Sequence, residues 1–150
     1  MKYNGVIRHR FDGFTSALRA NSLEVNSEHI FEIESDVCQD AIIALGKHIA
    51  SMKKEFSAIF ITSDQIASYV VQGLVSEGVS VPDEMSIIGF DNLEICRQIS
   101  PQLTTIAQDL NQKAHFAVAT LFQRLSDPSL PAQSMVLDVE LVERASVSQK

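Results

Sequence analysis

Short apolar runs alternate with amphipathic stretches along most of this chain. Residues 58–62 (AIFIT) form a run rich in β-branched side chains, which predicts a strand buried on both faces of a parallel sheet. Ile66, Val70 and Leu74 then recur every fourth residue, which predicts one apolar face of a helix. Residues 85–90 (MSIIGF) form a second apolar run. We therefore predict a strand–helix–strand unit whose two strands are parallel.

The predicted helix of this unit is bounded by residues that usually stand at helix ends. Ser63 and Asp64 offer side-chain oxygens before its N-terminus, where they can accept hydrogen bonds from free backbone N–H groups. Gly78 suits the left-handed position just after its C-terminus. Pro82 and Asp83 follow as a turn.

The same alternation continues on both sides of this unit. Upstream, the pattern predicts a helix over residues 10–20, a strand over 29–33 and a helix over 37–52. Downstream, it predicts a short extended piece over 104–106, a helix over 110–125 and a final strand over 135–142. The predicted fold class is therefore α/β, with an open, mostly parallel sheet flanked by helices. The pattern opens on a helix, with no clear strand ahead of it.

Acidic residues outnumber basic ones in this chain of 150 residues, with 19 Asp and Glu against 12 Lys and Arg. The formal net charge is −7. A surface that binds nucleic acid is normally basic, because neutralising phosphates supplies much of its affinity. We therefore expect that this segment does not bind DNA by itself.

Neither a membrane span nor a secretory signal is visible. No apolar run approaches the roughly 18 residues that a spanning helix needs, and residues 1–5 (MKYNG) do not begin an apolar signal segment. Cys38 and Cys96 lie neither in a CxxC pair nor near a histidine at metal-binding spacing. We expect two reduced thiols in a cytosolic protein, with no metal site and no cofactor.

Polar side chains follow the two clearest predicted strands. Residues 62–64 (Thr-Ser-Asp) come after the first, and Asp91 and Asn92 come after the second. In open α/β sheets, ligands bind beyond the carboxyl ends of the strands, and carboxylates there can accept hydrogen bonds from a polyhydroxylated ligand. A helix cap explains Asp64 fully, and a turn-forming Asp-Asn pair explains Asp91 as well as a ligand contact does, so the structural interpretations stay open beside the functional ones. Residues 34–36 (Glu-Ser-Asp) are a third candidate.

The common enzyme signatures are missing. The chain has no HExxH, GxSxG or GxGxxG motif and no glycine-rich phosphate loop. A small α/β enzyme that uses Asp64 or Asp91 as an acid or base is an alternative that the sequence does not favour. We expect a protein without enzymatic activity.

Several of these segments, in order and spacing, resemble the effector-binding core of the LacI/GalR family of transcriptional regulators. They are residues 58–67 (AIFITSDQIA), 78–92 (GVSVPDEMSIIGFDN) and 101–106 (PQLTTI). Residues 10–18 (RFDGFTSAL) are similar to that family's Arg-x-x-Gly-Phe helix, and residues 141–146 (LVERAS) to its usual C-terminal ending. The resemblance covers nearly the whole chain.

The resemblance implies a periplasmic-binding-protein-like sensor of two lobes, with a small molecule, usually a sugar or a nucleobase, between them. Carried over by position, Arg10 and Asp91 are identified as effector-binding residues, and Ser63 and Gln108 as further polar contacts. The family often places an aromatic ring against the ligand just after its second strand. The corresponding residues 33–36 (Ile-Glu-Ser-Asp) include no aromatic side chain.

The resemblance also predicts how the chain is divided. Residues 5–103 and 134–150 are expected to form the second lobe, and residues 104–130 to cross toward the first lobe. The DNA-binding headpiece, the first lobe and the first strand of the second lobe would all precede residue 1. The chain is therefore expected to be an incomplete effector-binding core.

The function implied is small-molecule sensing, with a sugar as the expected effector, by a LacI-type regulator in the bacterial cytoplasm. Effector binding would shift the population between states that do and do not bind the operator, and only the headpiece would contact operator DNA. A periplasmic solute-binding protein of the sugar-transport type is the alternative, since it shares the fold. A helix-turn-helix upstream favours the regulator, whereas a signal peptide favours the transport protein.

Self-association is expected for two reasons. In the family, the helix equivalent to residues 65–77 and the loop equivalent to residues 93–99 form part of a two-fold dimer contact. The residues placed to serve it here are Tyr69, Leu93, Ile95 and Cys96. In an incomplete core, the apolar face of the 110–125 helix would also lack its cover, and monomers avoid such patches. We therefore expect a homodimer or a larger assembly.

Overall fold

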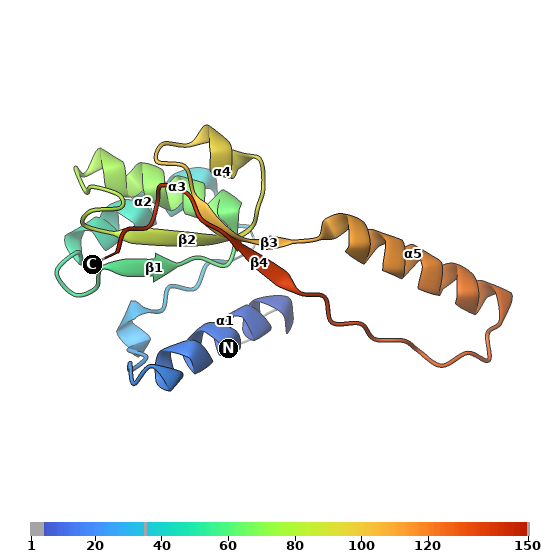
Figure 1. Ribbon diagram of the computed structural model, residues 1–150. Helices are drawn as coiled ribbons and strands as arrows, with labels where there is room; N and C mark the ends of the chain where they lie inside the picture. Colours follow the sequence, from blue (N-terminus) through green and yellow to red (C-terminus); the bar gives the residue numbers. More distant parts are fainter. Residues whose placement is uncertain (1–4, 35, 150) are drawn as a thin grey trace.

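The computed structural model describes residues 5–34 and 36–149 and shows one sheet with helices on both of its faces (Figure 1). In chain order the elements are α1 (Gly5–Ala20), a short 3-10 helix (Ser27–His29), α2 (Gln39–Ser51), β1 (Ala58–Phe60), α3 (Asp64–Ser76), β2 (Ser86–Asp91), α4 (Ile95–Gln98), β3 (Thr104–Gln108), α5 (Leu110–Ser126) and β4 (Val139–Val142). The strand order is β1-β2-β3-β4, with β1, β2 and β3 parallel and β4 antiparallel to β3. The predicted α/β class with an open, mostly parallel sheet is confirmed.

The predicted strand–helix–strand unit is present as β1, α3 and β2. Residues 58–60 of β1 pair in parallel with residues 86–88 of β2. Helix α3 ends at Ser76, and Gly78 follows in the left-handed conformation with φ of 76°. Glycine adopts this conformation without the steric cost that a Cβ atom brings. The residue spacing therefore located both strands and the end of the helix. The prediction that the first strand is buried on both faces is wrong, because β1 lies at the edge of the described sheet and is partly exposed.

The prediction of a strand over residues 29–33 is wrong. His29 ends a 3-10 helix, and residues 30–33 belong to no strand of the described sheet. Within the described residues, β1 is an edge strand, because the sheet begins with it. An apolar run becomes a strand only when a neighbouring strand satisfies its backbone N–H and C=O groups. Residues 30–33 have no such neighbour among the described strands, so the run stays irregular although its apolar side chains are partly buried.

The core lies on the face of the sheet that α2 and α3 cover. Its buried members include Val70, Leu74, Met85, Ile87 and Leu103. Glycines bring the two helices together: a Cβ atom on Gly46 would lie 2.5 Å from the Val70 carbonyl oxygen, and one on Gly73 would collide with the Ile43 carbonyl oxygen. The two backbones are therefore in direct contact where the helices cross.

Helix α1 lies on the opposite face of the sheet (Figure 1). It begins at Gly5, earlier than predicted. The Phe14 ring stacks on the Phe60 ring of β1, with 5.2 Å between the ring centroids. This contact holds α1 beside the sheet and places the side chain of Arg10, one turn earlier, near the carboxyl end of β1.

Helix α5 and the chain that returns from it to β4 project away from the rest of the molecule (Figure 1). No residue of α5 is buried, and its large apolar side chains are exposed: Leu110, Val118, Leu121, Phe122 and Leu125. The final strand covers residues 139–142, only the second half of its predicted range. We call residues 109–138 the arm. Among the described helices, none is long and apolar enough to cross a bilayer.

Candidate functional site

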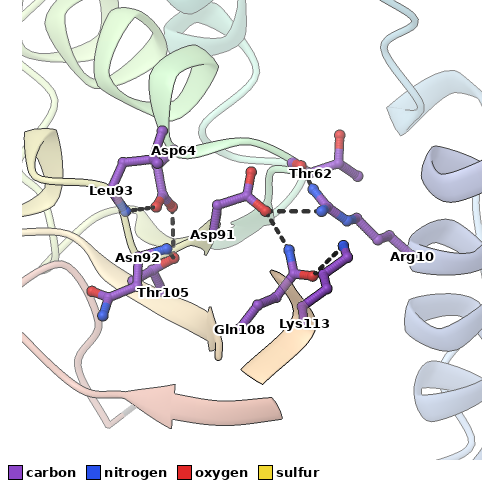
Figure 2. Close-up of polar contacts among 9 residues, drawn as sticks. All are labelled: Arg10, Thr62, Asp64, Asp91, Asn92, Leu93, Thr105, Gln108 and Lys113. Carbon is purple, nitrogen blue, oxygen red and sulfur yellow. Dashed lines mark hydrogen bonds and ion pairs between the residues drawn. The ribbon is translucent and has the colours of Figure 1, made fainter. Parts of the chain in front are cut away.

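Polar side chains from α1, β2 and β3 meet at the carboxyl ends of the parallel strands (Figure 2). The Arg10 guanidinium donates one hydrogen bond from Nη1 to the Thr62 carbonyl oxygen at 2.5 Å and another from Nη2 to Asp91 Oδ1 at 2.8 Å. Thr62 follows β1, and Asp91 is the last residue of β2. Two strand ends that lie far apart in the sequence are thus joined by one side chain from α1.

Gln108, the last residue of β3, completes this group. Its Nε2 donates to Asp91 Oδ1 at 2.7 Å, and its Oε1 accepts from Lys113 Nζ of α5 at 3.5 Å. We call Arg10, Asp91 and Gln108 the polar cluster. Among the described residues, both hydrogen bonds to the Asp91 carboxylate go to Oδ1, so Oδ2 remains able to accept hydrogen bonds from another molecule.

The polar cluster is partly shielded from water. The exposed fractions of the side chains are 15% for Arg10 and 25% for Asp91. The Arg10 guanidinium carbon also lies 3.8 Å from the centroid of the Phe90 ring, an arrangement in which the electron-rich ring face attracts the cation. Partial burial strengthens the Arg10–Asp91 ion pair relative to a fully exposed one, because less water screens it.

The backbone at Asp91 and Asn92 is unusual. Their φ angles are 112° and 55°, in a half of conformational space that residues with a Cβ atom rarely occupy. Such conformations cost on the order of 1–3 kcal/mol each and tend to occur at functional sites. They persist where the surroundings hold them. The result here is a sharp turn that directs the Asp91 carboxylate toward Arg10.

Of the other predicted site positions, Ser63 lies next to the polar cluster, whereas residues 34–36 do not contribute to its hydrogen bonds. Ser63 is the N-cap residue of α3 and directly follows Thr62, but its hydroxyl does not cap the helix. Glu34 and Asp36 are exposed, and the hydrogen bonds that join the cluster come from other residues. Ser35 lies outside the described residues. The structure therefore brings together Arg10, Asp91 and Gln108, with Ser63 adjacent to them.

The interpretation of Asp64 as a helix cap is wrong. Asp64 is the first residue of α3 and is completely buried. Its Oδ1 accepts from the Thr105 hydroxyl at 2.6 Å and its Oδ2 from the Leu93 N–H at 2.8 Å. The carboxylate turns away from its own helix because these two donors lie on neighbouring segments that the sequence does not place beside it.

Asp64 also affects the thiol of Cys96. Burial raises the pKa of Cys96 from 9.0 to about 12, and a hydrogen bond to the negatively charged Asp64 contributes to the rise. Cys96 is completely buried in the core, so its side chain does not reach the surface where the predicted dimer contact would lie. Of the other residues predicted there, Leu93 is exposed, and Tyr69 and Ile95 are partly buried.

Some features of the site had no signal in the sequence. The Thr62 carbonyl is a backbone atom, Phe90 is one of several apolar residues in its strand, and Lys113 sits on the arm. Two signals led to this edge: the rule that ligands bind at the carboxyl ends of strands, and the family resemblance that pointed to Arg10, Asp91 and Gln108. Within the described residues, no group of three or more His, Cys, Asp and Glu side chains is placed to hold a metal ion.

Comparisons with known proteins agree with this fold and place the chain in a family. Residues 2–147 match the family model of the periplasmic binding protein-like domain. The chain is 34% identical over 140 residues to the HTH-type transcriptional repressor PurR of Photobacterium profundum, covering 93% of this chain and 41% of the relative. It is 30% identical over 142 residues to the ribose operon repressor of Haemophilus influenzae, covering 95% and 42%.

A solved structure shows the same likeness. The LacI family transcriptional regulator from Enterococcus faecalis, with bound ribose, is 31% identical and superposes with a TM-score of 0.77, over 95% of this chain and 49% of that one. The chain spans about two fifths of the length of the curated relatives it matches. These relatives are transcriptional repressors and regulators, which favours the regulator interpretation over the transport protein. The chain therefore belongs to the periplasmic binding protein-like domain family, in the form found in LacI-family transcriptional regulators.

Proposed function

We propose that this chain is the effector-sensing part of a LacI-type transcriptional regulator and that a sugar binds at the polar cluster. The observation that carries the proposal is the Asp91 carboxylate. Its Oδ1 is held by Arg10 and Gln108 at 2.8 Å and 2.7 Å, while Oδ2 is available. A carboxylate fixed through one oxygen presents the other in a defined direction, so little ordering remains to be done when a ligand binds.

The charge of the polar cluster suits a neutral, polyhydroxylated ligand. The positive charge of Arg10 and the negative charge of Asp91 balance each other, and both side chains are mostly buried. Sugar hydroxyls donate and accept hydrogen bonds, so they can use the Asp91 carboxylate and the remaining N–H groups of Arg10 together. D-ribose is the first sugar to test, because a LacI family relative of 31% identity holds ribose.

The test is titration of this chain with D-ribose, followed by NMR spectroscopy, in matched variants. Arg10→Ala and Asp91→Asn each remove one charged partner, and we expect binding to weaken by about 1.5–3 kcal/mol, roughly 10- to 150-fold. Arg8→Ala is the matched control: Arg8 lies on the same helix, is exposed, and pairs with Asp12 at 2.9 Å. It should leave the affinity unchanged.

Equal affinity in the Arg10→Ala, Asp91→Asn and Arg8→Ala variants would contradict the proposed site. Binding of a nucleobase in place of D-ribose, lost in the same two variants, would keep the site and change the ligand class. A circular dichroism melt of each variant separates loss of the site from loss of the fold.

For the whole regulator, we propose that the segment of residues 104–130, which begins in this lobe as β3, crosses toward a first lobe and that a headpiece contacts operator DNA. The protein would act in the bacterial cytoplasm, where its operator lies, and would catalyse no reaction. With a net charge of −7, this chain alone is expected to give no gel shift at physiological salt. A shift at micromolar protein that disappears steeply with added salt would contradict this.

We further propose that the regulator is a homodimer and that Tyr69, Leu93 and Ile95 take part in its contact. Leu93 lies just before the short helix α4, and Ile95 is its first residue. Tyr69 lies on α3, which packs beside α4. Replacement of Leu93 by Glu should lower the mass measured by light scattering, because burying an unpaired charge at an interface costs several kcal/mol. An unchanged mass would place the contact elsewhere.

A further inference from the structure

Asp64 is a buried carboxylate that the proposed binding site does not use. It is completely buried, and among the described residues no Lys, Arg or His forms an ion pair with it. Burying a charge without a partner is costly unless hydrogen bonds offset the lost hydration. The Thr105 hydroxyl and the Leu93 N–H provide them, at 2.6 Å and 2.8 Å.

The neighbouring strand is shaped to admit this carboxylate. A Cβ atom on Gly89 of β2 would collide with Asp64 Oδ1 and would lie 2.9 Å from Leu103 Cδ2. The side chain of Asp64 therefore occupies the space that a larger residue at position 89 would fill. Gly89 is also two residues before Asp91, so the Asp64 carboxylate packs against the same strand, β2, whose last residue belongs to the site.

The contacts of Asp64 lead to the strained turn. Leu93 follows Asp91 and Asn92, whose φ angles are 112° and 55°, and its N–H is fixed by Asp64. The Thr105 hydroxyl donates to Asp64 and also accepts from the Asn92 N–H at 3.4 Å. Asp64 and Thr105 thus hold two consecutive N–H groups just beyond Asp91 (Figure 2).

A second group holds the same turn from the other side. The Arg144 guanidinium donates to Asn92 Oδ1 at 2.6 Å and to the Leu103 carbonyl oxygen at 2.6 Å. A backbone in a sparsely populated conformation persists when its surroundings over-determine it. The turn is held at the Leu93 N–H, the Asn92 N–H and the Asn92 side chain, and two of these three contacts depend on Asp64 or Thr105.

We propose that Asp64 is a positioning residue for effector binding, which it serves by holding, together with Thr105, the Asp91–Asn92 turn that directs the Asp91 carboxylate into the polar cluster. This rests on the proposed function of that cluster. Asp64 acts through the turn and does not touch the effector. The interaction of a ligand with Asp91, at the end of β2, then depends on Asp64, a buried residue of helix α3.

The test compares two adjacent buried threonines. Thr105→Val removes the hydroxyl that joins Asp64 to the turn, and Thr105→Ser restores a hydroxyl at the same place. Thr104→Val is the matched control, because Thr104 is also buried and its hydroxyl accepts from the Arg144 backbone N–H at 2.9 Å. Asp64→Asn keeps the shape of the side chain and removes its charge. Each variant is titrated with D-ribose, and its ligand-free NMR spectrum and urea unfolding are recorded.

Thr105→Val and Asp64→Asn should weaken D-ribose binding by about tenfold or more. They should also shift the Asp91, Asn92 and Leu93 backbone signals and lower the protection of the Leu93 amide from hydrogen exchange. Thr104→Val should change binding by less than about twofold at a comparable loss of stability, and Thr105→Ser should recover most of the affinity.

Equal loss of affinity in Thr104→Val and Thr105→Val, with the Asn92 and Leu93 signals of Thr104→Val unchanged, would overturn the proposal, since it would show a general effect of stability and not an effect through Arg144 on the turn. Unchanged turn signals in Thr105→Val and Asp64→Asn would overturn it as well. If D-ribose does not bind the unaltered chain, binding of D-ribose by this lobe alone has failed, and the ligand-free spectra still decide whether Asp64 and Thr105 hold the turn.

Discussion

Helices α3 and α5 have a similar apolar periodicity and opposite surroundings. Helix α3 has seven buried residues, among them Leu74 with no exposed area, whereas α5 has none, and its Leu121 is 58% exposed. Both sequences predict a helix with one apolar face, and both form one. The difference shows that periodicity specifies where a helix can be buried and that a neighbouring element decides whether it is buried.

The contrast extends to the site. Asp91 and Gln108 are the last residues of sheet strands, and Arg10 reaches Asp91 from α1, while Lys113 reaches Gln108 from α5. The part of the molecule outside the arm, which we call the body, therefore holds the polar cluster in place. The arm adds one contact at the edge of the cluster, from Lys113 to Gln108. Any rearrangement of the arm relative to the body would move Lys113 and leave the Arg10–Asp91 pair intact.

The sharpest test of this contrast is one truncation made in each helix. Leu74→Ala should lower the free energy of unfolding by about 2–5 kcal/mol, because it leaves a cavity in a closely packed core. Leu121→Ala should change it by no more than about 0.5 kcal/mol, as at other exposed positions. Urea unfolding followed by circular dichroism measures both. A large loss in Leu121→Ala would show that α5 folds back on the body in solution.

A smaller effect is expected from the helix crossing within the body. Gly73→Ala forces a methyl group against the Ile43 backbone, and such overpacking costs about 1–3 kcal/mol. Gly13→Ala is the control, since nothing lies within 4 Å of a Cβ atom there. Alanine is the better helix former, so that change should be neutral or stabilising by up to about 1 kcal/mol. Thermal melts compare the two, and equal melting temperatures would mean that the helices can separate at no cost.

The pH dependence should distinguish the buried thiol from the exposed one. Burial raises the pKa of Cys96 to about 12 from 9.0. Below pH 9 the thiol is protonated in the folded and unfolded chain, so its ionisation does not oppose folding. As the pH rises from about 9 toward 12, the unfolded chain ionises first, and stability is lost.

Cys96→Ala should therefore flatten the fall in stability above about pH 9, whereas Cys38→Ala, at an exposed residue, should leave the slope unchanged. Unfolding in urea between about pH 8 and about pH 11 measures the two slopes. Rapid alkylation of Cys96 in the folded chain would contradict its burial.

The smallest effect on stability is expected from charges on the arm. Leu121→Lys combined with Leu125→Lys alters side chains that are 58% and 68% exposed, so the free energy of unfolding should stay within about 0.5 kcal/mol. If the apolar face of α5 mediates association, the mass from light scattering should fall, because lysines break the apolar patch. An unchanged assembly would show that the arm is not its contact.

Much of the fold follows from local patterns that do not depend on distant residues. Strands β1 and β2 were visible as short apolar runs, α3 as a periodic face, and its end as Gly78, which has a positive φ. The polar cluster was predicted in part, because strand ends are marked in the sequence and Arg10 belongs to a recognisable motif. The strands, the helix and its end need only the chain's own covalent geometry and a hydrophobic face, whereas Arg10 was found through the family resemblance.

Other features were decided by tertiary structure. Residues 29–33 have the composition of a strand, yet no described strand lies beside them to satisfy their backbone. Asp64 has the position of a helix cap, yet Thr105 and the Leu93 N–H draw its carboxylate into the core. The sequence determined which residues are apolar, which can cap and which can carry charge. Only the tertiary structure decided which neighbours each one meets, because burial and hydrogen bonding are properties of pairs and not of single residues.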